Sequence, residues 1–578
     1  MKRLAVIPLI AALMITPVAA DPTTGTGQGI DGDVVVEVDA DENTIYSVEV
    51  IEQNETLGIG SVAVETLPGE IVEKNSILVD DIAGATVTSM AIKEAVKEAL
   101  EAAGIDPANF EVESEEEEEV EKTEETIDCD VVIVGAGGAG LTAAVRATQE
   151  GADVLVLEKM PMIGGNSLKA SGGMNCAGTK FQEEAGITDS GVEEFIEDTM
   201  EGGHQLNDRD LVTTMAENSA EAVEWLASID APLPKVAATG GTTHKYLHSP
   251  EDGSPVGQYL IQKLGEEADR LGINIMLNTT ATEILMEDGA AVGVLANDSA
   301  HDYVINAKAV ILATGGFGSN FDLMTSFNPS LANAVTTNHP GATGDGIMMA
   351  EAVGAATVDM EQIQLHPTVY QETSMLVSEK MRSLGAILVN QEGKRFCNDL
   401  ATRDAVSAAE LEQTGGYAYI IFDQNLVDHN ASAQEYINVG MAVTGDSYEE
   451  LAQAMGVDAD AFVETMETWN AAVAAGKDEE FGRNNGMDDD LSTAPYYAIK
   501  IAPGIHHTMG GIKINTNTEV ISTEGEVIPG LYAAGETTGG VHGGNRIGGN
   551  AVCDFVVFGR IAGAEAAGYA AGAAEDAA

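Results

Sequence analysis

The stretch CDVVIVGAGGAGLTAAVRATQEGADVLVLEK, residues 129–159, decides the fold. It predicts a buried strand over 130–134, a glycine turn, a helix, and a second strand over 153–157 that ends at Glu158. Glycines let the backbone approach a pyrophosphate, whose charge a helix N-terminus stabilises, and the acid accepts hydrogen bonds from a ribose. The sequence therefore predicts an α/β protein with a Rossmann-like dinucleotide-binding domain. The glycines with G-x-G-x-x-G spacing are Gly135, Gly137 and Gly140.

Further glycine turns favour FAD over a nicotinamide dinucleotide. MIGGNSLKASGGMN occupies 162–175, AVILATGGFG occupies 309–318, and GLYAAGETTGG occupies 530–540. Each turn alone also fits an ordinary loop. As a set they indicate one long ligand that several distant segments approach, as FAD would be when it extends through a large domain.

Composition excludes several classes of function. The chain has 578 residues, enough for two or more domains, and 27 basic against 94 acidic residues give a formal charge of −67. Such a surface repels nucleic acid and anionic lipid. None of the four cysteines lies in a C-x-x-C or C-x-x-C-H motif, so haem, zinc and iron–sulfur sites have no support. The cysteines are Cys129, Cys176, Cys397 and Cys553.

The N-terminus, MKRLAVIPLIAALMITPVAADP, has the pattern of a secretory leader. Two basic residues precede a short apolar run and small residues before a cleavage point. We predict a signal peptide over 1–20 and an exported protein, periplasmic or at the cell surface. The alternative is a leader that is retained as an anchor.

A small module is predicted over 21–112. Residues 33–38 and 45–52 have strand patterns, and 89–103 have helical periodicity that ends at Gly104. The run ESEEEEEVEKTEET, 113–126, is typical of a solvated acidic linker.

Ten segments together resemble the soluble fumarate reductase family, flavoproteins related to flavocytochrome c and to the succinate dehydrogenase flavoprotein subunit. The resemblance covers roughly 127–571 and implies an FAD-binding domain in two segments, 127–361 and 504–571, with an α+β capping domain over 362–503. The segments are VVIVGAGGAG, EKMPMIGGNS, KASGGMN, HPGATGDG, QLHPT, SEKMRSLGA, ATRDAVS, HHTMGG, LYAAGETTGGVHGGNRIGGNA and FGR.

The resemblance implies reduction of a carbon–carbon double bond beside a carboxylate. That reaction needs a hydride on one carbon, a proton on the other, and cationic or hydrogen-bonding groups that hold the carboxylate. By resemblance, Arg403 is the proton donor, and Glu379 and Arg382 form the relay that reprotonates it. Glu379 also contacts substrate, and Ser378 replaces the usual threonine. The remaining substrate-binding positions implied by the family are His366, His506, Arg546 and Gly549.

Simpler interpretations of these residues stay open. Arg403 alone fits a surface ion pair, and Glu379 with Arg382 fits a helix ion pair. His506 and His507 also fit metal ligands or core histidines. Because the pKa of arginine is very high, Arg403 could instead only stabilise charge while a water delivers the proton.

The resemblance also implies the residues that hold FAD without a covalent bond. The set is Gly135, Ala136, Gly137, Gly138, Ala139, Gly140, Glu158, Lys159, Asn166, Ser167, Ser171, Gly172, Gly173, Ala281, Thr314, Gly315, Asp345, His507, Glu536, Ala551 and Val552. A bound-sodium loop seen in relatives matches Thr508, Met509, Gly510, Glu536 and Thr538.

The segment DDIAGATVTS, 80–89, resembles the site at which a flavin transferase esterifies FMN to a threonine in exported FMN-binding domains. The threonine is Thr86, and Ala83 stands where that motif usually has serine or threonine. A helix N-terminus after it would stabilise the phosphate. The alternative is a plain turn in which Thr88 or Ser89 caps the helix.

We therefore predict a monomeric reductase of an α,β-unsaturated carboxylate that takes electrons from a membrane-bound donor through FMN. Two separate cationic groups, each able to hold a carboxylate, favour fumarate as the substrate. Urocanate reducers of this family lack a histidine at the position of His366. Leu376 stands where fumarate reductases commonly have methionine, which keeps acrylate, methacrylate, cinnamate-type acids and urocanate open. The other hypotheses are a ketosteroid dehydrogenase, a succinate oxidase and an extracellular electron carrier.

Overall fold

The computed structural model of the chain describes residues 22–29, 32–53, 55, 60–79, 81–82, 85–111, 122–238, 242, 244–332 and 334–576. The predicted leader and residues 113–121 of the predicted linker lie outside the described residues. The chain forms two compact units, residues 1–118 and 119–578. Among the described helices, none has the length and apolar character needed to cross a membrane.

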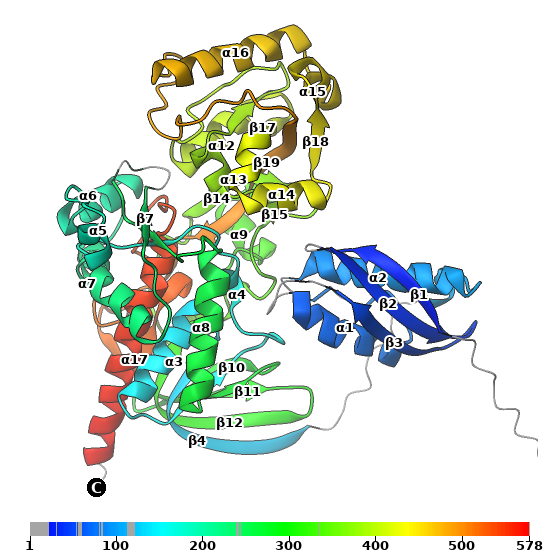
Figure 1. The fold of residues 1–578 in the computed structure, drawn as a ribbon. Coiled ribbons are helices and arrows are strands. Elements are labelled where there is room, and N and C mark those ends of the chain that lie inside the picture. Colours follow the sequence, from blue (N-terminus) through cyan, green and yellow to red (C-terminus); the bar gives the residue numbers. More distant parts are fainter. Residues whose placement is uncertain are drawn as a thin grey trace, which may run out of the picture. The chain divides into compact units, whose positions relative to one another are not determined.

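The first unit is a three-stranded antiparallel sheet covered by two helices (Figure 1). Burial alternates along β2, so that Val34, Val36 and Val38 face the helices. Gly25 and Gly27 let α2 approach β1, because a Cβ at either position would lie about 2 Å from a backbone oxygen of the helix. The elements are β1 (Thr23–Gln28), β2 (Asp33–Ala40), β3 (Ile45–Glu52), α1 (Gly60–Lys74), α2 (Thr86–Ala102) and the short helix η1 (Pro107–Phe110).

Helix α2 begins earlier than the sequence predicted. The expected range was 89–103, and the helix spans Thr86–Ala102, with Gly104 in the left-handed region after it. Neither Thr88 nor Ser89 caps it, which corrects the alternative stated above. The Thr88 hydroxyl donates to Glu55, and the Ser89 hydroxyl accepts from the amide of Ile82 at 2.9 Å.

The second unit contains an eight-stranded sheet with a parallel centre. The predicted strands over 130–134 and 153–157 are confirmed, but β4 begins at Thr123, so residues 123–126 belong to a strand and not to the linker. Helices α3 and α17 contact this sheet, and α8 packs against α3 (Figure 1). The strands are β4 (Thr123–Val134), β5 (Val154–Leu157), β9 (Asn274–Met276), β10 (Thr280–Glu287), β11 (Ala290–Asn297), β12 (His301–Leu312), β21 (Glu519–Ile521) and β22 (Val527–Ala533).

Helices and short strands surround this sheet and complete the α/β, FAD-type fold. The helices are α3 (Gly138–Gln149), α4 (Gly165–Leu168), α5 (Lys180–Glu184), α6 (Val192–Gly202), α7 (Arg209–Ser228), α8 (Val256–Leu271), α9 (Phe321–Phe327), η2 (Pro329–Leu331), α10 (Asp345–Ala352), η4 (Gly535–Thr537) and α17 (Asn550–Asp576). The strands are β6 (Met174–Asn175), β7 (Lys235–Ala237), β8 (Leu247–Ser249), β13 (Thr357–Val358) and β20 (Gly511–Ile512).

A second sheet, with helices on it, is inserted between β13 and β20 and is called the cap here. Its core includes Trp469, whose ring centre lies 4.6 and 4.7 Å from the guanidinium groups of Arg395 and Arg483. The strands are β14 (Ile363–Tyr370), β15 (Met375–Leu376), β16 (Ile387–Val389), β17 (Ala418–Asp423), β18 (Ala442–Gly445) and β19 (Tyr496–Thr508). The helices are α11 (Glu379–Ser383), α12 (Arg403–Leu411), η3 (Thr414–Gly416), α13 (Gln424–His429), α14 (Ala431–Asn438), α15 (Tyr448–Met455) and α16 (Ala459–Ala475).

The chain enters the cap along β14 and leaves it along β19, and these two strands pair antiparallel. The pairing shifts register after Gln364 and again between His366 and Val369. One half of β19 belongs to the cap sheet with β17 and β18, and the other half carries His506 and His507. This two-stranded connection therefore holds predicted site residues on both strands.

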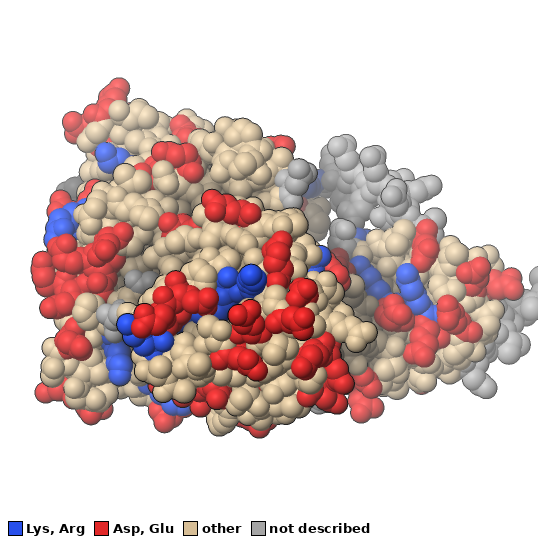
Figure 2. Space-filling view, turned by 90° about the horizontal axis from the view of Figure 1, so that it is seen from above, with Lys and Arg blue, Asp and Glu red and all other residues tan. Residues whose placement is uncertain are grey.

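Acidic side chains dominate the face that Figure 2 displays, with Lys and Arg in small groups between them. This agrees with the excess of 94 acidic over 27 basic residues. A small anion that approaches this surface meets net repulsion, so a site for anions must gather its positive charge locally.

Candidate active site

The glycine turn between β4 and α3 is shaped for close approach by a ligand. Gly135 has a φ of 103°, and a Cβ at Gly140 would lie 1.8 Å from the carbonyl oxygen of Gly135. At Gly137 a Cβ would make only an ordinary contact, because the nearest atom would be 3.7 Å away. Because this open turn leads into the N-terminus of the 12-residue helix α3, it fits the pyrophosphate of FAD.

Glu158 ties the second strand to this turn. Its carboxylate accepts hydrogen bonds from the amides of Ala136 and Met160, both at 2.9 Å. Each oxygen retains a further acceptor position for a ribose hydroxyl. Burial raises the pKa of Glu158, and the two amides oppose that effect. Thr279, next to the strand that carries Ala281, donates its amide to the Glu158 carbonyl at 2.9 Å, which brings β10 beside the same place.

A polar network joins the distant segments predicted to hold FAD. The side-chain amide of Asn166 donates to Asn338 at 2.6 Å and to Glu536 at 3.2 Å. Glu536 also accepts from the amide of Thr508 at 3.1 Å and lies 3.4 Å from Nδ1 of His507. The glycine-rich segments at both ends of the second unit therefore meet at Glu536.

Other predicted FAD residues lie on segments in contact with this network. Gly315 has a φ of 74° and open space where its Cβ would be. Ala551 and Val552 lie in the first turn of α17, which packs along α3. Pairs joined by hydrogen bonds are Lys159 with Asp345 at 2.6 Å, Thr314 with Thr537 at 3.1 Å, the Gly138 amide with Ser167 at 3.1 Å, and Ser171 with Ser378 at 3.2 Å. Gly172 and Gly173 follow Ser171 in the turn before β6.

Arg403, the first residue of α12, is held by Glu379, the first residue of α11. Two guanidinium nitrogens of Arg403 donate to one carboxylate oxygen of Glu379 at 2.8 and 2.9 Å. Burial would raise the pKa of Glu379, but Arg403 and Arg382 bring it below its usual value. The pair is mostly buried, with 11% and 14% of the side chains exposed, so the surface-ion-pair interpretation of Arg403 does not describe this geometry.

His366 and His506 face each other, with ring centroids 5.0 Å apart. The amide of Thr368 donates to Nδ1 of His366 at 3.2 Å, so the proton of the neutral ring is on Nε2. Nε2 is buried without a hydrogen-bond partner among the described residues and lies 4.0 Å from Glu379. His366 thus presents a buried donor that lacks an acceptor, as a site for a carboxylate requires.

Burial favours the neutral form of the three histidines of this cluster. Burial lowers the pKa of His366, His506 and His507 well below the usual value, and Arg403 and Arg546 add to the shift. The positive charge of the cluster therefore comes from arginine. A bound carboxylate would raise these pKa values, because its negative charge favours the protonated ring.

Arg546 is also buried, and its Nε has no partner among the described residues. Burial lowers its pKa to about 9, and Arg403 contributes to the shift. The side chain of Gln364 joins the two arginines: its oxygen accepts from Arg403 at 3.1 Å, and its nitrogen donates to the Arg546 carbonyl at 2.8 Å. Gln364, which opens the QLHPT segment, was not among the predicted site residues. Gly549, which follows Arg546, has a φ of 90° and packs against Asn175.

The third member of the predicted relay is not in direct contact with the second. Arg382 is fully buried on α11, and its Nη1 donates to the carbonyl of Asp399 at 2.6 Å. In the described part of the chain, the basic side chains within 4 Å of the Glu379 carboxylate are Arg403 and His366. The structure therefore does not contain the helix ion pair of Glu379 with Arg382.

Ser378 caps α11, and its amide donates to the hydroxyl of Tyr436 at 3.0 Å. That hydroxyl lies 3.3 Å from the carbonyl of Leu376, so one buried tyrosine fixes the loop that carries both specificity positions. Tyr436 was not selected from the sequence, because nothing in its local pattern distinguishes it from a core tyrosine.

The residues of the predicted sodium loop come together around Glu536. Thr508 bonds to it, the Thr538 hydroxyl donates to the Gly535 carbonyl at 2.9 Å, and the Met509 amide donates to the Gln362 carbonyl at 3.0 Å. Gly510 packs against the backbone of Asp359. Within the described ranges, no cluster of His, Cys, Asp and Glu could hold a metal ion, and sodium binding stays a prediction.

Thr86 begins α2, while its side chain and the neighbouring Ala83 and Gly84 lie outside the described residues. The residue before the helix is Ala85, and among the described residues no side chain caps the helix N-terminus there. Backbone amides at an uncapped N-terminus bind phosphate well, so this end of α2 fits the phosphate of FMN.

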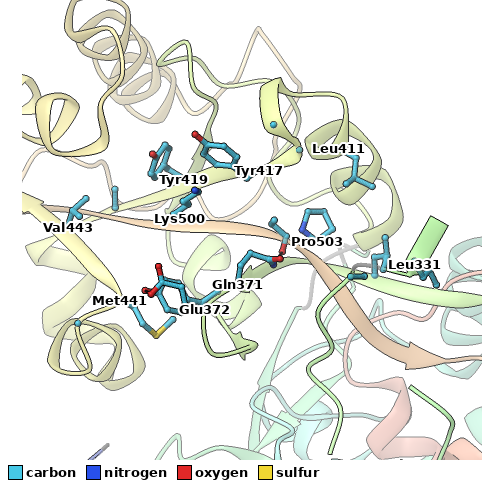
Figure 3. Close-up of a pocket in the computed structure, with 18 of the residues that line it drawn as sticks. Leu331, Gln371, Glu372, Leu411, Tyr417, Tyr419, Met441, Val443, Lys500 and Pro503 are labelled. Atoms are coloured by element: carbon cyan, nitrogen blue, oxygen red, sulfur yellow. Dashed lines mark hydrogen bonds between the residues drawn. The ribbon is translucent and has the colours of Figure 1, made fainter. Parts of the chain in front are cut away.

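A cavity of about 780 Å³ lies between the cap and the segment of η2, and it includes none of the predicted site residues. Figure 3 shows Lys500 beside Tyr417 and Tyr419, and the Lys500 ammonium lies 4.2 Å from the centre of the Tyr417 ring. Leu411 and Pro503 line its other side. The candidate active site is therefore the arginine–histidine cluster and not this cavity.

The three buried histidines predict that acid destabilises the protein. In the unfolded chain the three histidines bind protons below about pH 6.5, whereas in the folded chain burial opposes their protonation. The free energy of unfolding therefore falls as the pH falls below that value. Each contributes up to about 1.4 kcal/mol per pH unit. Denaturant unfolding between pH 5 and 8 should give a shallower dependence for His366→Gln than for the wild type, with exposed His429→Gln as the control substitution. An equal slope in His366→Gln would contradict a neutral His366.

Comparison with known proteins agrees with this arrangement. The FAD binding domain family matches residues 130–552, and the FMN-binding domain family matches residues 29–101. The chain is 44% identical over 548 residues to an NADH:fumarate oxidoreductase of Klebsiella pneumoniae, which covers 95% of this chain and 58% of that protein. It is 37% identical over 569 residues to a urocanate reductase of Eggerthella lenta, covering 95% and 93%.

A solved structure has the same fold. The open conformation of a flavocytochrome c3 fumarate reductase matches with a TM-score of 0.67 and 43% identity, covering 77% of this chain and 79% of that one. The match confirms the predicted fold class. FAD and FMN are the cofactors whose binding domains the chain contains. The chain thus belongs to the fumarate reductase-like family of FAD-dependent oxidoreductases and carries an FMN-binding domain ahead of its FAD-binding domain.

Proposed function

We propose that this protein is an exported reductase of an α,β-unsaturated carboxylate, with fumarate as the first choice and succinate as the product. The observation that carries the proposal is the convergence of Arg403, Arg546 and His366, whose donors are buried and in part lack acceptors. Burying such donors without acceptors is costly unless the cluster binds an anion.

Each residue has a proposed role. Arg546 and His506 hold one carboxylate and His366 holds the other, while Ser378 lines the site. Bound FAD, when reduced, supplies the hydride. Arg403 stabilises the charge that develops on the carboxylate and delivers the proton, and Glu379 fixes the Arg403 guanidinium at 2.8 Å so that it faces the substrate. Alternatively, a water molecule delivers the proton, and Arg403 only stabilises the developing charge.

The remaining parts of the proposal concern electron entry. We infer that FMN is attached covalently to Thr86 by a flavin transferase, and that a membrane-bound donor passes electrons to it. The proposed domain limits are a leader over 1–20, an FMN-binding domain over 21–112, an FAD-binding domain over 127–361 and 504–571, and a cap over 362–503. The uncapped N-terminus of α2 supports the attachment site.

A panel of unsaturated acids tests the substrate. Purified protein loaded with both flavins should oxidise reduced viologen when fumarate is added, and acrylate, methacrylate, cinnamate and urocanate should be slower. If one of these acids is reduced fast and fumarate only at the background rate, fumarate is rejected as the substrate. The assignment to reductases of unsaturated carboxylates would still hold. No turnover with any of them would reject the function.

Urocanate is the second candidate. Leu376, which stands where fumarate reductases commonly have methionine, and the similarity to a urocanate reductase favour it. His366, which urocanate reducers lack, argues for a dicarboxylate. The ratio of kcat/KM for fumarate and urocanate decides between them.

A further inference from the structure

A hydrogen bond ties the helix that carries Arg403 to the FAD-binding part of the chain. The ring N–H at Nε2 of His204 donates to Oδ2 of Asp404 at 2.9 Å, and Asp404 directly follows Arg403 at the start of α12. Among the described residues, no other pairing of a basic with an acidic side chain joins the cap to the FAD-binding segments. The second oxygen of Asp404 is buried without a described partner, so His204 is the residue that holds this carboxylate.

The backbone at His204 shows that the side chain is not there for local convenience. Helix α6 ends in a Schellman motif, in which the amide of His204 donates to the Glu201 carbonyl at 3.0 Å and the amide of Gln205 to the Met200 carbonyl at 2.8 Å. His204 has a φ of 57° at the position of this motif where glycine is the usual residue, because a side chain is strained there. A histidine at this position costs stability, which indicates a role for its ring.

The same turn after α6 holds the segment that leads to Arg546. The amide of Gly544, two residues before Arg546, donates to the carbonyl of Gly203 at 2.8 Å. Gly544 also lies against the His204 ring, since a Cβ there would be 3.1 Å from Cδ2 of that ring. One short turn therefore contacts both the segment of Arg546 and, through His204, the first turn of the helix that carries Arg403.

The bond is suited to placing α12 and contributes little to the stability of the fold. The side chains of His204 and Asp404 are 53% and 39% exposed, and exposed pairs of this kind add little to the free energy of unfolding. The position of Arg403 is more sensitive, because a group that acts on the transition state loses much of its effect when it is displaced by about 1 Å.

We propose that His204 is a positioning residue for Arg403. Its bond to Asp404 holds the first turn of α12 against the turn after α6, and this keeps the Arg403 guanidinium in place beside Arg546 during reduction of the substrate. The proposal rests on the proposed function, because it needs Arg403 to act on the substrate.

The variant His204→Gly tests the role, because glycine suits the backbone of the Schellman motif but cannot make the bond. We expect FAD content as in the wild type and a denaturation midpoint at least as high. We expect kcat for fumarate to fall about three- to tenfold, the range of one hydrogen bond, with KM changed less than about twofold. His204→Gln, which keeps a donor, should recover part of kcat. Gln205→Gly is the matched control, since it relieves the neighbouring residue, whose φ is 60°, and leaves the bond intact.

Two further measurements separate positioning from other effects of the substitution. In the background of Asp404→Ala, which removes the acceptor, His204→Gly should cause no additional loss of kcat, because both changes break one bond. Hydrogen exchange of the oxidised protein without substrate should be faster over residues 403–411 in His204→Gly than in the wild type and in Gln205→Gly. If His204→Gly does not retain FAD, His204→Asn replaces it, because asparagine tolerates the left-handed backbone and has a shorter side chain.

The possible failures are distinguishable. Wild-type kcat together with wild-type exchange over 403–411 in His204→Gly would overturn the proposal and leave the proposed function intact. A loss of kcat that is equally large with and without the Asp404 carboxylate would overturn it as well. If the wild type reduces no unsaturated acid, the proposed function fails, and the exchange comparison alone then decides whether His204 holds α12.

Discussion

Replacement of Arg403 by alanine is expected to lower kcat for enoate reduction by about a thousandfold or more. The variant loses the charge that faces the developing anion and the proposed proton donor together, and each effect is typically worth about 10²–10³-fold or more. It also leaves the buried Glu379 carboxylate without the two hydrogen bonds of 2.8 and 2.9 Å. The measurement is the steady-state rate with reduced viologen and fumarate.

Two further measurements show whether the loss of activity lies in the reduction of the substrate. FAD content and the rate of ferricyanide reduction should match the wild type, because Arg403 is not among the residues that line the FAD turn. Arg403→Lys should recover little, since lysine cannot offer the forked donors that Glu379 and Gln364 accept from. A protein that only carries electrons would keep full activity in Arg403→Ala, and that result would favour the electron-carrier hypothesis.

Thr86→Ala is expected to abolish covalent FMN. The ester needs the threonine hydroxyl, and no other hydroxyl of the segment is free to replace it, since Thr88 bonds to Glu55 and Ser89 to the amide of Ile82. Beyond the mass difference between threonine and alanine, intact mass should fall by the mass of FMN less one water, and the flavin fluorescence of the denatured protein band should disappear.

Two control samples test the attachment of FMN to Thr86. Thr24→Ala, an exposed threonine of the same unit, should keep the covalent flavin. Wild-type protein from a host without a flavin transferase should lose it although Thr86 is intact. Covalent flavin that persists in Thr86→Ala would show that the attachment site lies elsewhere.

Local patterns predicted much of the fold. The glycine spacing from Gly135 to Gly140 defined the strand, turn and helix, because only glycine tolerates the 1.8 Å approach at Gly140 and the positive φ at Gly135. The periodicity of 33–38 and 45–52 predicted β2 and β3 for a similar reason, since alternate residues face the helices. The start of β4 at Thr123 was missed because charged residues there resemble a linker.

The candidate site was harder to predict, since its properties arise from long-range contacts. The motifs located Arg403, Glu379, His366 and Arg546, but not Gln364 between the two arginines. The neutral state of the histidines depends on burial beside arginine, which no local pattern records.

The paired strands β14 and β19 have a mechanical consequence for this enzyme. Both crossings of the chain into the cap are joined into one narrow ribbon. A ribbon of two strands resists stretching but twists with little resistance, so torsion about its long axis is the softest motion open to the cap. His366 and His506 sit on the ribbon near that axis, and Arg403 is tied to it by the 3.1 Å hydrogen bond to Gln364 of β14, so these groups would travel little. The arginine–histidine cluster can thus stay assembled while the outer parts of the cap turn.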